Sequence, residues 1–275
     1  MVVKAGNWFT ATVVPSAMLP YPPRFYLNPP SVRVGPYHNY EEYEEYYYNQ
    51  TEGIGDPIYH YLDEYRFNFD TGLLQGIHWL STDEPVESLA DIPAWEKAPV
   101  QIGLLRLEAL SPVGVTTQIA TTEVVALFTS TRWVDPRGTS YAALNADLLR
   151  RASTVVRLQV AQDLYLLIAD ENIAGWVLVN PARYLTDLWE GLPGTDDDEL
   201  AVMLATYFSI VAVPNLYDMD RRHPETLDPL ISLYEKLGGT SGDVTHRHVL
   251  RIYLDNLTSR LYGKTISGDP RPTTL

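Results

Sequence analysis

Residues 65 to 80 read Tyr-Arg-Phe-Asn-Phe-Asp-Thr-Gly-Leu-Leu-Gln-Gly-Ile-His-Trp-Leu, and this stretch carries the clearest local signal for secondary structure in the chain. At its start, aromatic residues alternate with polar ones, which is the period-two pattern of a half-buried strand; these residues are Tyr65, Phe67 and Phe69. Asp70-Thr71-Gly72 supplies turn chemistry, because glycine takes the positive φ that tight turns need. Residues 73 to 80 then return as a second strand. The stretch therefore predicts an antiparallel hairpin.

Further strands are expected before and after this hairpin. Their apolar residues alternate or run in short stretches bounded by turn residues; the segments are 2–14, 100–110, 113–119, 123–129, 156–160, 164–168 and 173–179. Ser140 is expected to cap a short helix over residues 141 to 151. Asn180-Pro181 is expected to end a strand and to start a helix through Trp189.

The last third of the chain predicts helices. Four acids at 196 to 199 complement the positive end of a helix dipole, so a helix is expected from there to about Val211. A second helix is expected from Pro224 to Gly238, and a third over 243–262 with an apolar stripe along one side. The fold class that follows is α+β, an antiparallel sheet built from hairpins and meanders with helices mainly in the C-terminal third.

Three regions differ in composition. Residues 1–64 are rich in Pro, Tyr and Glu, and seven of the 20 prolines lie before residue 37, so we expect interrupted, extended structure that packs on the body or extends from it. Residues 65–262 are expected to form a single α+β domain, and residues 263–275 a polar tail. Whether the two groups of strands form one sheet or two stays open.

Composition limits the function classes. The net charge is −15, so nucleic acid would be repelled. The chain has no cysteine, which excludes disulfides, thiolate nucleophiles and Cys-ligated metal sites. No secretory signal pattern opens it, and its longest strongly apolar stretch, residues 201–213, is shorter than the roughly 20 residues that a membrane span needs. We therefore expect a cytoplasmic protein with no membrane and no nucleic-acid partner.

The familiar motifs of catalysis and metal binding are absent from the sequence. His246 and His248 are two positions apart, whereas helical zinc ligands lie three or four apart. Asp218-Met219-Asp220 resembles the start of a calcium loop but lacks the glycine and the bidentate glutamate that such a loop needs. No Gly-x-Ser-x-Gly, phosphate loop or dinucleotide fingerprint occurs. We expect no catalytic residue, no metal and no cofactor.

Residues 37 to 48 read Tyr-His-Asn-Tyr-Glu-Glu-Tyr-Glu-Glu-Tyr-Tyr-Tyr, a segment both anionic and aromatic. Tyrosine offers large contact area at low entropic cost, and neighbouring glutamates select basic partners. One or two helical turns are expected over 41–50. The predicted contact residues are Tyr43, Glu44, Glu45, Tyr46, Tyr47 and Tyr48. Tyr65, Phe67 and Phe69 are predicted to form the supporting strand, whose hairpin offers a sheet edge to an extended peptide.

Residues 65 to 79 resemble the strand–Asp-x-Gly–strand hairpin of small bacterial accessory proteins that carry no catalytic residues. Some of these proteins resemble immunity proteins, which neutralise a partner. Others are similar to peptide-binding helpers encoded with enzymes of ribosomal-peptide biosynthesis. The resemblance implies a non-enzymatic binding role, with a precursor peptide as one such partner, and it carries over no functional residue.

Three hypotheses follow. The first is a non-enzymatic accessory protein that binds a basic or amphipathic peptide or protein through the Tyr/Glu surface and a sheet edge. The second is an immunity-type inhibitor whose acids cover the basic site of a toxin. The third is a hydrolase or transferase without a local motif. A homodimer through the C-terminal apolar stripe is an alternative to packing of that stripe on the protein's own sheet.

Overall fold

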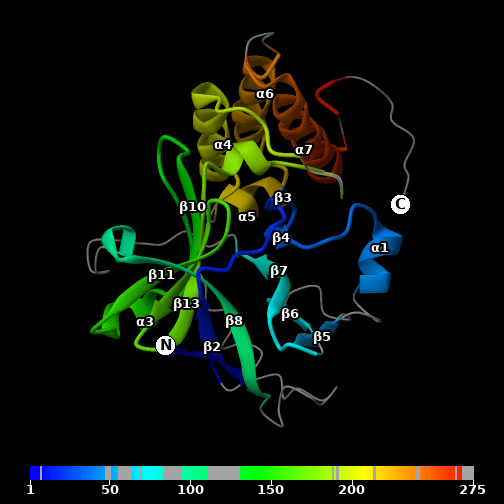
Figure 1. Ribbon diagram of the computed structural model, residues 1–275. Helices are drawn as coiled ribbons and strands as arrows, with labels where there is room; N and C mark the ends of the chain where they lie inside the picture. The colour runs from blue at the N-terminus through cyan, green and yellow to red at the C-terminus, as the bar shows by residue number, and fades with distance from the viewer. Residues whose placement is uncertain are drawn as a thin grey trace.

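The computed structural model in Figure 1 describes most of the chain. The described residues are 1–6, 8–46, 51–54, 63–68, 70–82, 95–110, 131–187, 189, 192–212, 215–238, 242–263 and 265–267. At residues 51–54, 110, 217, 220 and 224 the description covers the backbone alone.

An eight-stranded mixed sheet forms the larger of two sheets. Its strand order is β1 (Val2–Ala5), β2 (Phe9–Pro15), β8 (Val100–Leu110), β11 (Val155–Ala161), β12 (Leu164–Ala169), β13 (Asn172–Val179), β10 (Ser140–Leu144) and β9 (Thr131–Val134). β1 pairs with β13 as well as with β2, so the first six strands close into a ring that β10 and β9 extend. The β1–β13 and β8–β11 pairs are parallel, and the others are antiparallel.

A five-stranded antiparallel sheet lies beside this ring. Its order is β3 (Arg24–Leu27), β4 (Pro30–Val34), β7 (Leu74–Leu80), β6 (Glu64–Asn68) and β5 (Thr51–Ile54). The predicted hairpin is confirmed as β6 and β7, and Gly72 in its turn has a φ of 66°. The carbonyl of Gly72 accepts a hydrogen bond of 2.9 Å from the amide of Leu107, which ties the turn to β8.

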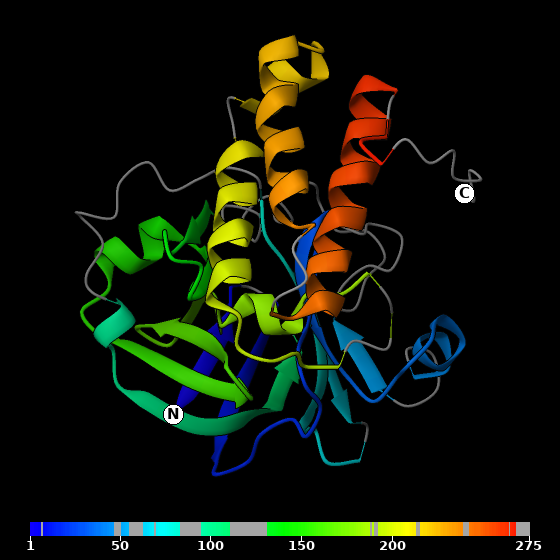
Figure 2. The same cartoon turned by 90° about the horizontal axis from the view of Figure 1, so that it is seen from above.

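The C-terminal third is helical, with α4 (Asp198–Ile210), α5 (Asn215–Asp220), α6 (Leu227–Lys236) and α7 (Val244–Tyr262). Figure 2 shows α4, α6 and α7 side by side on the flank of the sheets. Asp197 caps α4, within the acidic run expected to start that helix, and Asp243 caps α7. Arg247 of α7 reaches back to the Asp197 carboxylate at 2.9 Å and so joins the two helix starts.

One continuous core joins the two sheets and the helices. Phe9 of β2 packs edge-to-face against Tyr65 and Phe67 of β6, with ring centroids 5.1 and 5.5 Å apart. Phe208 of α4 contacts Phe25 and Tyr141 in the same core. The α+β class is therefore confirmed, with mostly antiparallel sheets and helices gathered in the C-terminal third. β1 and β2 lie inside the eight-stranded sheet, so part of the region 1–64 belongs to the shared core.

Several local expectations are corrected. The segment 2–14 belongs to two antiparallel strands, β1 and β2, and not to one. The proline-rich stretch contains the β3–β4 hairpin, in which Pro30 is the first residue of its strand and needs no amide there. Residues 140–144 are strand β10, because four of them are buried in the sheet, and Asn145 rather than Ser140 caps the helix α3 (Ala146–Arg151).

Two further expectations concern segments near these. The helix expected from Pro181 to Trp189 is a single 3₁₀ turn, η4 (Pro181–Tyr184). The strands expected at 113–119 and 123–129 lie outside the described residues.

The expectation that the 65–80 hairpin offers a sheet edge is wrong. β4 pairs with the outer side of β7, and β5 pairs with the outer side of β6. The hairpin is therefore interior, and among the described strands β3 and β5 end this sheet. The pairing of β7 with β4 joins residues 43 to 49 positions apart, which a local pattern does not reveal.

The apolar stripe of α7 faces the protein's own core, with Val249 and Leu257 buried there together with Leu250 and Leu254. None of the helices in the described part of the chain is long and apolar enough to cross a membrane.

Replacing Phe9 by Ala tests whether the sheets share one core. The change removes a fully packed ring between β2 and β6, so the free energy of unfolding should fall by about 3–5 kcal/mol. Denaturant unfolding monitored by tryptophan fluorescence and by circular dichroism measures this loss. Coincident transitions at a lower midpoint are expected, and two separated transitions would show that the sheets unfold independently.

Candidate functional site

The predicted Tyr/Glu segment begins with a short, firmly capped helix, α1 (Tyr40–Glu45). The side chain of Asn39 accepts a hydrogen bond of 2.8 Å from the amide of Glu42. In return, the Glu42 carboxylate accepts one of 2.7 Å from the amide of His38. This reciprocal capping holds a helix that would be too short to persist alone. Figures 1 and 2 show α1 at the periphery, apart from α4, α6 and α7.

One side of α1 is bound to the body through aromatic rings. Tyr43 lies against Trp189 with ring centroids 5.0 Å apart, and Tyr37 contacts Tyr43 at 5.0 Å and Tyr46 at 5.8 Å. Tyr37 and Tyr46 are buried, whereas Tyr43 and Trp189 are half-buried. We call these four residues the aromatic cover.

The other side of α1 is turned to solvent and is anionic. Tyr40 is 55% exposed, and its ring leans toward Trp189 at 5.9 Å. Exposed carboxylates surround it; they belong to Glu41, Glu42, Glu44 and Glu45. The helix therefore presents four negative charges and one ring on a surface that the aromatic cover fixes in place.

Beneath the cover lies one face of the five-stranded sheet, and this face is polar. Four side chains stand directly opposite one another across four strands; they are Arg24, Arg33, His78 and Glu64. Arg66 lies on the same face opposite Gly76. Except for the half-buried Arg33, the charged members are at most 7% exposed. The opposite face of the sheet is apolar and packs into the core, with Phe25, Val32, Tyr65, Phe67, Ile77 and Trp79.

Most of this polar face is satisfied internally. Arg24 donates to the carbonyls of Gly35 and Tyr37 at 3.3 and 2.6 Å, and its guanidinium lies over the Tyr37 ring. Glu64 accepts from Arg66 at 3.0 Å and from the Tyr43 hydroxyl at 3.2 Å. A buried ion pair held in this way is expensive to break from one side, because the remaining charge is left without a partner.

Arg33 is held differently. Its guanidinium lies over the Tyr26 ring and over the Trp189 ring, at 4.8 Å from each centroid. The guanidinium thus contacts two aromatic rings, which attract a cation through their negative faces. Trp189 therefore links the outer helix α1 to the arginine of the sheet beneath it.

Burial keeps the tyrosines of the cover neutral. It raises the pKa of the Tyr37, Tyr43 and Tyr46 hydroxyls well above their usual range, and the nearby Glu64 carboxylate adds to the increase at Tyr43. These hydroxyls act as hydrogen-bonding groups and not as bases near neutral pH.

The predicted contact residues divide between the two sides of α1. Glu44 and Glu45 are exposed, Tyr43 is half-buried, and Tyr46 is buried at 3% exposure, so its ring supports the helix and faces no partner. Tyr65 and Phe67 are in β6 as expected, but their rings lie in the core on the opposite face of the sheet. Tyr47, Tyr48 and Phe69 lie outside the described residues.

Sequence reasoning missed the polar face and Trp189. Arg24, Tyr26, Ser31 and Arg33 alternate with apolar residues in a region we expected to be irregular because of its prolines. That alternation was the available signal. Trp189 carries no local signal, because its partners come from β3, β4 and α1.

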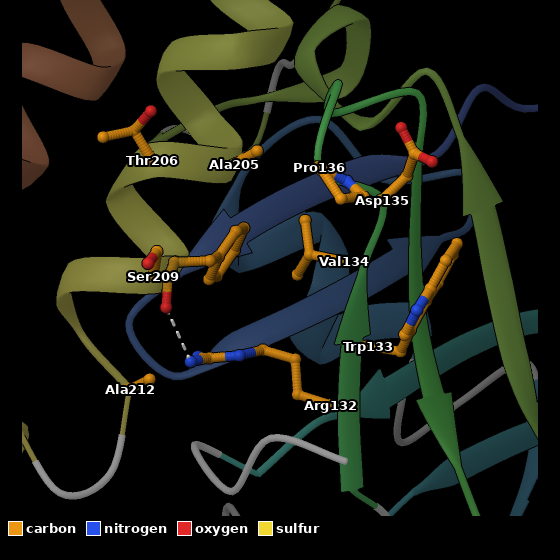
Figure 3. A pocket seen from close by; sticks show the side chains of 10 residues that line it. Arg132, Trp133, Val134, Asp135, Pro136, Ala205, Thr206, Ser209 and Ala212 are labelled. Atoms are coloured by element: carbon orange, nitrogen blue, oxygen red, sulfur yellow. Dashed lines mark hydrogen bonds between the residues drawn. The ribbon is translucent and has the colours of Figure 1, made fainter. Parts of the chain in front are cut away.

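A pocket of about 520 Å³ lies elsewhere, between β9 and α4 (Figure 3). The guanidinium of Arg132 points across its floor and donates to the carbonyl of Phe208 at 3.0 Å. The Thr206 hydroxyl donates to the carbonyl of Val202 within its own helix. The charged residues among those that line this pocket are Arg132 and Asp135.

The histidine and aspartates that the sequence offered as metal-site candidates have structural roles. His246 lies 2.9 Å from the Asp243 carboxylate and 3.2 Å from the carbonyl of Leu192, at the start of α7. Asp218-Met219-Asp220 is part of the helix α5, with Met219 fully buried, so it does not have the loop form of a calcium site. No group of three or more potential metal ligands occurs within the described residues.

Comparison with known proteins adds no assignment, since neither a protein-family model nor a curated protein matches the chain.

Replacing Gly76 by Ala tests how α1 is seated. A Cβ at this position would lie 2.8 Å from the Tyr46 hydroxyl oxygen and 3.0 Å from the carbonyl oxygen of Val34. The Tyr46 ring must therefore shift, and overpacking of this kind costs about 1–3 kcal/mol. Thermal unfolding should show that loss, and proteolysis within residues 38–46 should become faster. An unchanged proteolysis rate would show that Tyr46 does not hold the helix.

Asp63, which precedes Glu64, predicts a pH dependence. Burial raises the pKa of its carboxyl to about 7, although the Leu80 amide donates to it at 2.8 Å. The folded state therefore binds a proton more tightly than the unfolded state, whose Asp pKa is about 4. The contribution of Asp63 to stability is therefore fully present below about pH 4 and is lost as the pH rises through about 7.

Asp63→Asn removes this titration and keeps an oxygen for the Leu80 amide. The fall in unfolding free energy between about pH 4 and 7 should shrink by at least about 1 kcal/mol in the variant. Urea unfolding at several pH values measures both curves. Parallel curves for the two proteins would contradict the assignment.

Proposed function

We propose that this protein binds a basic or amphipathic peptide or protein partner, without catalysis, through the exposed side of α1. The observation that carries the proposal is that one side of this helix packs on the body while the other side faces solvent. Tyr37, Tyr43 and Tyr46 fix it to the body, while four glutamates and Tyr40 face solvent. Binding surfaces of this kind gain affinity because little conformational freedom is lost when the partner docks.

Charge and ring have separate roles in this proposal. The glutamates draw a Lys- or Arg-bearing partner toward α1 and raise the rate of encounter, an effect that salt weakens. Tyr40 offers apolar area and a hydroxyl at the point of contact. The ring leans on Trp189, so binding at Tyr40 should also change the surroundings of the indole.

The sheet edge that we expected at residues 65–80 has no part in the proposal, because both strands are paired on their outer sides. A peptide encoded for modification and a basic toxin both have the required charge. The two differ in size and affinity: a short peptide would contact α1 alone, whereas a folded toxin would cover a standard interface of about 800 Å² on each partner. The resemblance to accessory and immunity proteins is compatible with either.

Changing Glu41, Glu44 and Glu45 to Gln should weaken binding of a short Arg/Leu-rich peptide by about tenfold, since exposed charges contribute about 0.5 kcal/mol each. Glu42 is left unchanged because its carboxylate caps α1. Calorimetry at low and at raised salt measures the affinity, and the wild-type affinity should fall with salt more steeply than that of the variant.

A matched control carries the same change of charge on other surfaces, with Glu96, Glu225 and Glu235 changed to Gln; all three are exposed. Its affinity for the peptide should stay within about twofold of wild type, because the net charge of the protein acts only weakly at this distance in salt. If both triple variants lose affinity equally, attraction is general and α1 is not the site.

A further inference from the structure

We infer that Arg33, whose guanidinium contacts the rings of Tyr26 and Trp189, is a binding site for a carboxylate group. The inference does not rest on the proposed function, because it concerns the sheet beneath the cover and a ligand of opposite charge. It starts from an imbalance of charge on the polar face.

The polar face holds more positive charge than it neutralises. Arg66 is paired with Glu64 at 3.0 Å, with both side chains less than 10% exposed. Arg24 and Arg33 stand directly opposite each other on β3 and β4, and within the described residues neither has a carboxylate within 4.0 Å. Like charges that face each other across a strand pair repel, so an anion at this place would be stabilising.

The two arginines differ in what they lack. Arg24 is buried, and its terminal nitrogens already donate to the carbonyls of Gly35 and Tyr37. Arg33 has no hydrogen bond to an acceptor within the described residues. The Nε atoms of both arginines are buried without a partner, but the terminal nitrogens of Arg33 are not among the buried atoms, so a ligand can reach them. A carboxylate would give these nitrogens charge-assisted hydrogen bonds. Arg33 therefore carries the site, and Arg24 adds charge behind it.

The guanidinium of Arg33 favours a planar anion. It lies 4.8 Å from the ring centroids of Tyr26 and of Trp189. A carboxylate matches the edge of a guanidinium with two parallel hydrogen bonds in its plane. Arg33 is half-buried, so the edge is not sealed from solvent.

The surroundings leave the positive charge of Arg33 in excess. Asp187 is an exposed carboxylate near this site. Its charge contributes to the raised pKa of the Tyr26 and Tyr253 hydroxyls, but it forms no ion pair with Arg33.

The carboxylate that binds here belongs either to a small metabolite or to the end of a peptide whose basic residues contact α1. Trp189 touches both surfaces, so one ligand can reach both.

The first experiment measures thermal unfolding of wild type, Arg33→Gln and Arg33→Lys with added succinate, benzoate or inorganic phosphate, against sodium chloride of equal ionic strength. Saturating carboxylate should raise the wild-type midpoint by about 2–4 °C. The shift should vanish in Arg33→Gln. It should be smaller in Arg33→Lys, because lysine keeps the positive charge but cannot form the bidentate pair of hydrogen bonds that a guanidinium forms with a carboxylate. Each shift is taken relative to the same variant without ligand, so a lower starting stability does not affect it.

Arg137→Gln is the matched control, since Arg137 is an exposed arginine on another surface. It should give the wild-type shift. Equal shifts in wild type and Arg33→Gln would overturn the inference, as would the absence of any shift in wild type with either carboxylate. A shift produced by phosphate and not by carboxylates would overturn the assignment of a planar anion.

A second experiment separates the two sources of the carboxylate. The Arg/Leu-rich peptide is titrated by calorimetry with a free and with an amidated C-terminus. If amidation weakens binding at least about fivefold in wild type and not in Arg33→Gln, the site takes the end of a peptide. If amidation has no effect while succinate or benzoate still shifts the wild type alone, the site takes a small carboxylate. Loss of peptide binding in the α1 triple variant tests the proposed function separately.

Discussion

The five-stranded sheet buries both of its faces, and the site depends on this constraint. One face is apolar and packs against the strand ring through Phe9, Tyr65 and Phe67. The other carries three arginines, a glutamate and a histidine, which cannot be buried unless their hydrogen bonds and charges find partners. The aromatic cover makes this burial possible, because tyrosine and tryptophan supply apolar area together with hydroxyl groups and negative ring faces that contact the charged side chains.

The aromatic cover and the outer surface of α1 depend on the same residues, because the rings that cover the sheet also hold the helix in place. The helix has only six residues, so it exists because its capping residues and its tyrosines hold it on the sheet. Once held, it has to place its glutamates in water, since the tyrosines occupy the inner side. An anionic outer surface and a cationic inner face thus lie on the two sides of the same few rings. Trp189 touches both and is the natural reporter for either.

This separation of charge makes the inferred anion site compatible with a net charge of −15. At short range, a half-buried guanidinium interacts more strongly than the screened charges of the distant surface. In the proposed function, the acids of α1 would attract basic partners, and the inferred site at Arg33 would require them to carry a carboxylate. Recognition by two sites of opposite sign is more selective than recognition by either alone.

Elements that depend on neighbours along the chain were predictable from the sequence. The alternation and turn at residues 65–80, the acidic start of α4 and the charge of residues 37–48 all follow from local pattern. Long-range packing determines that β4 and β5 cover the hairpin and that Tyr46 faces inward. It also sets the row of polar side chains across the sheet, formed by Arg24, Arg33, His78 and Glu64. The reason is that strand register and the position of a helix on a sheet are set by contacts between segments distant in sequence, and a local pattern does not predict those contacts.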